Sequence, residues 1–243
     1  MRREYLTPLF SHKQTLPPTQ SATGKERNPL IYELVTDSST VNLIFYDIAS
    51  EDYLLPERLV KVYPHLFNSD AIIFLADPIM MPGIRNNLPT HLQYDLPPNT
   101  FVAQEPDASL LTRTLELFER VGGQQLNKFL RSMPIAITLS KSDLLKDCIP
   151  MSQPYRFLSN PQYNIYPDLR DLAVVDQEVK AIINDFGEKT LLQEAHLRNV
   201  RFFAASATGH LPDNNGLYPA VEPVRCLDPF IWILYQLRII EAV

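Results

Sequence analysis

The feature that most constrains the fold of this 243-residue chain is a short apolar run, Val41 to Tyr46, which stops abruptly at Asp47. Such a run predicts a strand buried on both faces, as in parallel sheets. Two later apolar runs, 135–139 and 200–205, also lead directly into polar residues. Because ligands of α/β sheets bind beyond the carboxyl ends of the strands, these polar residues are expected to meet at one edge of one sheet.

Strand and helix patterns alternate along the chain, which predicts a Rossmann-like α/β fold with a mostly parallel sheet and helices on both faces. Residues 30–35 and 41–46 flank a polar turn and predict an antiparallel hairpin. Residues 71–76 predict a further buried strand, reached from 41–46 by a parallel crossover. Apolar residues at helical spacing predict helices over residues 51–68, 107–131, 168–186 and 228–241.

Prolines and glycines set the expected loops and domain limits. The chain has 21 prolines but seven glycines, so few positions can form the tight glycine loops that cradle phosphates. Two proline-containing segments, 78–107 and 144–167, are expected to be long loop insertions. Residues 1–29 are interpreted as a connector or the tail of a lost helix, ahead of one domain over 30–243.

Composition and charge exclude several classes of function. The net charge of −6, with no basic stripe, argues against binding to nucleic-acid backbones. Cys148 and Cys226 are far apart, which indicates neither a disulfide framework nor a metal knuckle. The histidines have no ligand spacing, and no G-x-S-x-G elbow is present. No membrane span or signal peptide is evident, so a cytoplasmic protein is expected.

Three polar clusters follow the buried runs in order, and they are Asp47-Ile48-Ala49-Ser50, Ser140-Lys141-Ser142-Asp143 and Ser206-Ala207-Thr208-Gly209. They resemble the DxxG, [NT]KxD and SAxG motifs of P-loop GTPases of the translation-factor-related class. Over about residues 30–240, the sequence is most similar to the double-GTPase domains of bacterial conflict systems. The resemblance implies a P-loop NTPase-like fold that binds GTP or GDP with Mg²⁺.

The resemblance also assigns roles around the phosphates. Asp47 would hold the Mg²⁺ ion through a water molecule, since magnesium keeps much of its hydration shell. Glu51 would be the catalytic residue that orients the attacking water. From the residues alone, Asp47 could equally be the cap of a following helix.

The other two clusters would bind the guanine base. Asp143 would accept two hydrogen bonds from the base, Lys141 would lay its alkyl stem over it, and Ser140 stands at the Asn or Thr position of the motif. Backbone N–H groups at Ser206 and Ala207 would donate to the guanine carbonyl. Taken singly, each cluster also has the composition of an ordinary turn or helix cap.

The sequence departs from the family at the front. The phosphate loop GxxxxGK[ST] and the strand before it are missing, and Ser50 replaces the DxxG glycine. We therefore expect a truncated or degenerate guanine-nucleotide-binding domain, weak or inactive as a GTP hydrolase, that acts as a regulatory switch or scaffold with protein partners. The alternatives are a non-catalytic pseudo-GTPase interaction module and, third, an unrelated Rossmann-like enzyme.

Overall fold

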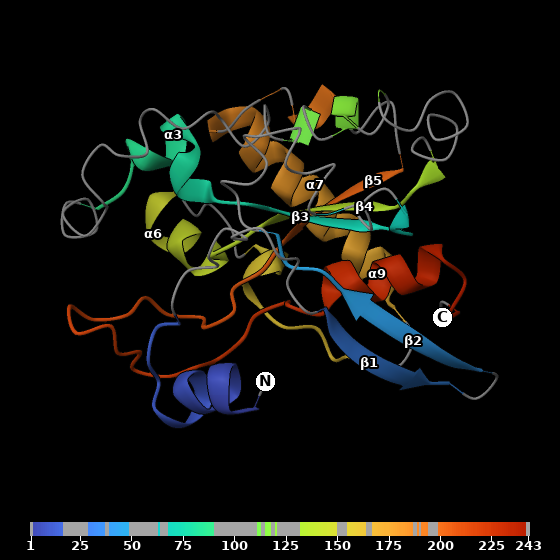
Figure 1. Cartoon of the computed structure of the whole chain (residues 1–243). Helices are drawn as coiled ribbons and strands as arrows, with labels where there is room; N and C mark the ends of the chain where they lie inside the picture. Colours follow the sequence, from blue (N-terminus) through green and yellow to red (C-terminus); the bar gives the residue numbers. More distant parts are fainter. Residues whose placement is uncertain are drawn as a thin grey trace.

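The structure is a computed structural model, and it describes residues 2–16, 29–36, 39–48, 63, 68–89, 111–112, 115–117, 120, 132–149, 155–163, 167–186, 189, 191–193 and 199–241. Within these residues the strands form two separate sheets, one antiparallel pair and one parallel sheet. Figure 1 shows the parallel sheet in the middle of the molecule and the antiparallel pair beside the C-terminal helix. The expected α/β class is confirmed.

The parallel sheet consists of β3 (Ile72–Ala76), β4 (Ile135–Leu139) and β5 (Val200–Ala204), in that spatial order. All five residues of the central strand β4 are buried, which explains why its sequence is apolar without polar alternation. Its pairing is in register from Ile135, which lies opposite Ile72 on one side and Val200 on the other. The strands expected at 71–76, 135–139 and 200–205 are confirmed.

The antiparallel pair is a hairpin of β1 (Leu30–Val35) and β2 (Thr40–Phe45), as predicted. The turn is closed by hydrogen bonds between Thr36 and Ser39, with the Thr36 N–H donating to the Ser39 carbonyl oxygen at 2.8 Å. One face packs inward, where the Phe45 ring lies 5.5 Å from the ring of Phe230 in helix α9.

The predicted position of β2 inside the parallel sheet is wrong. β2 pairs with β1 and with none of β3 to β5, so the parallel crossover expected from 41–46 to 71–76 is not formed. Its side chains alternate between half-buried and exposed, and Ile44 is 53% exposed. The apolar run was misleading because both faces of the hairpin carry apolar residues, although only one face packs against the rest of the protein.

Two long helices cover opposite faces of the parallel sheet. Helix α7 (Leu169–Phe186) packs its apolar stripe against the side of β5 that carries Phe202. Helix α9 (Asp228–Gln236) packs Trp232 against the neighbouring residue Phe203, with 5.7 Å between the ring centroids. Because successive strand residues face opposite ways, these contacts put the helices on both faces, as expected.

Short helices occupy the segments that were expected to be irregular. They are η3 (Pro78–Met80), α3 (Pro82–Arg85), α6 (Leu145–Cys148) and η5 (Arg156–Leu158). A further short helix, η4 (Ser142–Leu144), begins within the predicted polar cluster of residues 140–143. The N-terminal segment forms the π-helix η1 (Arg2–Ser11). The helix predicted over 51–68 lies outside the described residues except at positions 63 and 68. The described part of the helix predicted over 107–131 is helical and includes the buried Leu111 and Leu115. The predicted division into a connector, residues 1–29, and one domain, residues 30–243, stays a prediction.

A buried ion-pair network joins the starts of both long helices. The Arg225 guanidinium, 1% exposed, lies 2.7 Å from an Asp171 oxygen of α7 and 2.6 Å from an Asp228 oxygen of α9. Its Nε donates to the carbonyl oxygen of Arg156 at 3.0 Å, and the Arg156 side chain also pairs with Asp171, at 2.6 Å. The network therefore fixes the segment around η5 to both helices.

Candidate functional site

A cavity of about 540 Å³ lies beyond the carboxyl ends of the three parallel strands. Its wall combines apolar side chains with several polar ones: Ile79, Leu88, Lys141, Asp143, Leu144, Thr208, His210, Leu211, Pro212, Asp213, Asn214, Gly216 and Tyr218. The residues come from the segments that follow β3, β4 and β5. This is the edge at which α/β sheets bind their ligands.

The loop after β5 is held in place at its base. Ser206 is buried and pairs with Val224, its N–H donating to the Val224 carbonyl at 2.9 Å and its own carbonyl accepting at 2.8 Å. The Ser206 hydroxyl accepts a hydrogen bond from the Gly209 N–H at 2.8 Å. Gly209 has φ +71°, and a Cβ there would lie 2.3 Å from the Glu222 carbonyl oxygen, so this turn requires glycine.

The far part of the same loop is held by the N-terminal segment. The Thr15 N–H donates to the Gly216 carbonyl at 2.9 Å, and the Tyr218 N–H donates to the Lys13 carbonyl at 2.7 Å. Asp213 accepts from the backbone N–H of Leu217 at 2.8 Å, and this hydrogen bond is the main reason that its pKa lies below the ordinary value. The outer wall of the cavity is thus fixed by backbone hydrogen bonds.

The floor of the cavity is built where β3 and β4 end. Lys141 has the left-handed φ of 51°, and its Nζ lies 2.6 Å from an Asp77 oxygen just after β3. The Ser140 hydroxyl and N–H both donate to the Ala76 carbonyl, at 3.1 and 2.9 Å. Lys141 therefore ties two strand ends together while it lines the cavity.

Asp143 lies half-buried in the wall of the cavity. Within the described part of the chain, its carboxylate has no hydrogen bond or ion pair, in contrast to Asp77 and Asp213. Its charge acts on Tyr218 across the cavity. Burial raises the pKa of Tyr218, the negative charge of Asp143 raises it further, and Lys141 and Thr208 partly offset the rise.

The structure brings some of the residues predicted for the site together. Ser140, Lys141 and Asp143 lie at the same edge as Ser206 and Ala207, since the Ser142 N–H donates to the Ala205 carbonyl at 3.1 Å. Lys141 and Asp143 line the cavity, whereas Ser206 is buried beneath it.

Of the two residues predicted to act on the phosphates, the structure describes Asp47, which does not line the cavity. Asp47 follows β2 of the hairpin and is exposed, although the next residue, Ile48, packs against the core of the parallel sheet. Glu51 lies outside the described residues. The expected meeting of three strand ends at one sheet is therefore found for two of them, because β2 belongs to a different sheet.

Sequence reasoning missed the contribution of the loop after β5. Tyr218, His210 and Asp213 line the cavity, but the sequence of residues 209–223 has no helix or strand pattern and indicates a loop with glycine and proline. The signal that was available is the Asp213-Asn214-Asn215-Gly216 sequence, which is typical of a tight turn and fixes the loop that carries these side chains.

Comparison with known proteins gives one informative similarity. No family model matches the chain, and no solved structure matches it. The chain is similar to a proposed ESX-1 scaffolding and assembly protein, SaeC, of Mycolicibacterium smegmatis. The two are 26% identical over 250 residues, which cover 94% of this chain and 61% of SaeC. The chain thus spans less than two thirds of the length of the curated relative that it matches.

This finding overturns the resemblance to P-loop GTPases. The relative is named for scaffolding and assembly, so the prediction of a truncated or degenerate GTPase-like domain that binds guanine nucleotide is wrong, and a guanine nucleotide is not supported as a partner. The structure gives the physical reason for the false match. The cluster at Asp47 follows a strand of the hairpin and not of the parallel sheet. The cluster that contains Lys141 follows β4, and its lysine forms an ion pair with Asp77. The P-loop NTPase-like version of the fold is not confirmed.

Two further observations bear on metals and membranes. Across the described ranges, no group of three His, Cys, Asp or Glu side chains is arranged to hold a metal ion. The Mg²⁺ ion expected at Asp47 rested on the GTPase resemblance and stays a prediction. Among the helices that the structure describes, none is long and apolar enough to cross a membrane.

Proposed function

We propose that this chain takes part in ESX-1 scaffolding and assembly by binding protein partners. The observation that carries the proposal is the similarity to SaeC, which extends over 94% of the chain. The proposal concerns the part of SaeC that the chain matches, 61% of its length. A scaffold acts by holding partners, so its structure should offer surfaces for other proteins.

The hairpin supplies one such surface. Its outer face carries Ile31 and Ile44, which lie opposite each other in the β-ladder and are 64% and 53% exposed. Val35, on the same face, is 69% exposed. The polar pair Glu33 and Asn42 lies between Val35 and the two isoleucines on this face. Exposed apolar side chains on a two-stranded ribbon suit a surface that another protein covers. We name Ile31, Val35 and Ile44 the hairpin face.

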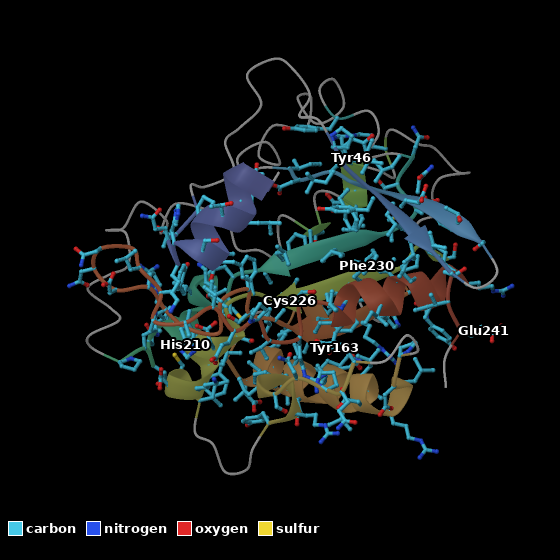
Figure 2. The ribbon with its side chains drawn as sticks, turned by 90° about the horizontal axis from the view of Figure 1, so that it is seen from below. Tyr46, Tyr163, His210, Cys226, Phe230 and Glu241 are labelled. Atoms are coloured by element: carbon cyan, nitrogen blue, oxygen red, sulfur yellow. The ribbon has the colours of Figure 1, made fainter. Side chains whose placement is uncertain are left out.

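The hairpin face and the cavity are separate. Figure 2 shows His210 of the cavity wall on one side of the molecule, well apart from Tyr46 and Phe230, which mark the hairpin and the helix beneath it. Two separate surfaces on one chain allow two contacts to be made at once. This arrangement suits a protein that holds others together.

The proposal is tested by co-purification from the native host. The tagged chain is compared with the variant Ile44→Lys, which places a charge on the hairpin face, and with the control Val174→Lys, which changes a 49% exposed residue of α7. We expect the wild type and the control to enrich ESX-1 proteins over an untagged strain, and Ile44→Lys to lose most of this enrichment.

Two results would count against the proposal. If the wild-type chain enriches no ESX-1 protein, the proposed function is wrong. If Ile44→Lys enriches the same proteins as the wild type, the function stands and the hairpin face is not the surface that binds them.

A further inference from the structure

The charged side chains that line the cavity differ in whether they have a hydrogen-bond or ion-pair partner. Lys141 is paired with Asp77 at 2.6 Å, Asp213 accepts backbone hydrogen bonds, and His210 lies 3.3 Å from Glu222. Asp143 is different, since no described residue pairs with it. Among the described residues that line the cavity, Asp143 is therefore the carboxylate that lacks both a hydrogen-bond partner and an ion-pair partner.

A partly buried carboxylate without a partner favours a cationic ligand, because the ligand replaces the water that the carboxylate loses. An anionic ligand such as a phosphate would meet repulsion from Asp143, and the nearby ammonium of Lys141 is already held by Asp77. A metal ion would need further oxygen ligands, and the described residues offer no cluster of three. The ligand should accordingly be an organic cation.

We propose that the cavity binds the guanidinium group of an arginine side chain from a partner protein, with Asp143 as the acceptor and Tyr218 beside the guanidinium plane. This inference deepens the proposed function. It rests on that function in one respect, namely that the arginine belongs to a partner protein.

The choice of arginine follows from the wall of the cavity. A guanidinium is more weakly hydrated than an ammonium, forms two parallel hydrogen bonds to a carboxylate, and stacks on aromatic rings. Tyr218 supplies the ring, and Leu88, Leu144 and Leu211 supply apolar surface for the stem of the side chain. The volume of about 540 Å³ accommodates the side chain together with parts of its neighbours in a peptide.

The test uses a fluorescent peptide, acetyl-Leu-Arg-Leu-amide, and a matched peptide in which citrulline replaces arginine. Citrulline has nearly the same shape but no charge, so the pair isolates the contribution of the guanidinium charge. Fluorescence anisotropy is measured with the full wild-type chain, with Asp143→Asn, and with the control Asp147→Asn, which removes a carboxylate from the exposed side of α6.

The wild type and Asp147→Asn should bind the arginine peptide about tenfold more tightly than the citrulline peptide, which corresponds to one strong charge-assisted contact. Asp143→Asn should abolish this preference while its thermal melting curve stays that of the wild type. Added salt should reduce the preference of the wild type.

Equal binding of the two peptides by the wild type, or no binding of either, overturns the arginine site. An unchanged preference in Asp143→Asn also overturns it, because a group other than Asp143 would then bind the guanidinium charge. None of these results touches the co-purification of ESX-1 proteins, so the arginine site and the proposed function can fail separately.

Discussion

Lys141 Nζ and Asp77 Oδ2 lie 2.6 Å apart and join the carboxyl ends of two neighbouring parallel strands. Lys141 stands two residues before Asp143 in the sequence, but its ammonium group is paired with Asp77 and not with Asp143. Because this lysine is held by another carboxylate, the charge of Asp143 stays available to a ligand in the cavity. The ion pair is exposed enough that its main effect should be on binding and not on stability.

This relationship predicts the effect of releasing Lys141. In Asp77→Asn the ammonium loses its partner and can turn towards Asp143, so the arginine peptide should bind about fivefold more weakly. The double variant Asp77→Asn with Lys141→Gln should recover the wild-type affinity, since no free cation remains. Titration of both variants with the arginine peptide measures this. Equal weakening in the single and double variants would contradict the explanation.

The buried network around Arg225 should be a main support of the fold. Asp171→Asn removes a charge that is 3% exposed and contacts Arg225 at 2.7 Å, so we expect a loss of about 3–5 kcal/mol in the free energy of unfolding. Asp185→Asn, an exposed change on the same helix, should alter it by less than about 0.5 kcal/mol. Urea unfolding measures both. A loss of under about 1 kcal/mol in Asp171→Asn would show that the network is dispensable.

The contribution of Asp171 should depend on pH. Burial acts to raise the pKa of Asp171, but hydrogen bonds and ion pairs with Arg225 and Arg156 outweigh burial, so the pKa lies below its ordinary value. Its stabilisation is therefore complete above the unfolded pKa of about 3.9 and is lost as pH falls through the lower folded pKa. The neighbouring Asp228 has a raised pKa, chiefly from burial, and acts in the opposite sense.

A comparison of the wild type with Asp171→Asn isolates this effect, because Asp228 is present in both. The difference between their free energies of unfolding should be constant near neutral pH and shrink below about pH 4. Urea unfolding across this range measures the difference. A difference that grows as the pH falls would contradict the assigned direction.

Gly83 should be needed where α3 approaches the end of α7. A Cβ at this position would lie 2.4 Å from the Phe186 carbonyl oxygen, so the backbone must move to accept even a methyl group. Gly83→Ala is expected to cost about 1–3 kcal/mol by thermal or urea unfolding. Asn86→Ala, an exposed change just after the same helix, should cost less than about 0.5 kcal/mol. Equal effects would show that the close approach is relieved without strain.

How much of the fold could be predicted from the sequence depends on whether the deciding contacts are between residues near or far apart in the sequence. β4 was predicted with the observed bounds, Ile135–Leu139, because a strand buried on both faces leaves an unbroken apolar run. The same rule failed for 41–46, since a hairpin with an exposed apolar face has a similar pattern and only tertiary packing distinguishes them. The bounds of β2 were nevertheless close to those observed, Thr40–Phe45.

The cavity was predictable only in part, for a similar reason. Lys141 and Asp143 could be found because they directly follow a buried strand. Tyr218 reaches the cavity through a loop that the N-terminal segment holds, and the pairing of Arg225 with Asp171 spans 54 positions of sequence. Contacts of this kind have no local pattern, so the sequence alone could not reveal them.

The central claim, a role in ESX-1 assembly, is tested most directly by the amount of assembled ESX-1 complex in the native host, measured by native gel electrophoresis of extracts with and without the gene for this chain. We predict that the complex decreases when the chain is absent, that the wild-type chain restores it, and that Ile44→Lys, which alters the hairpin face, restores it poorly. An unchanged amount of complex in the absence of the chain would contradict the account.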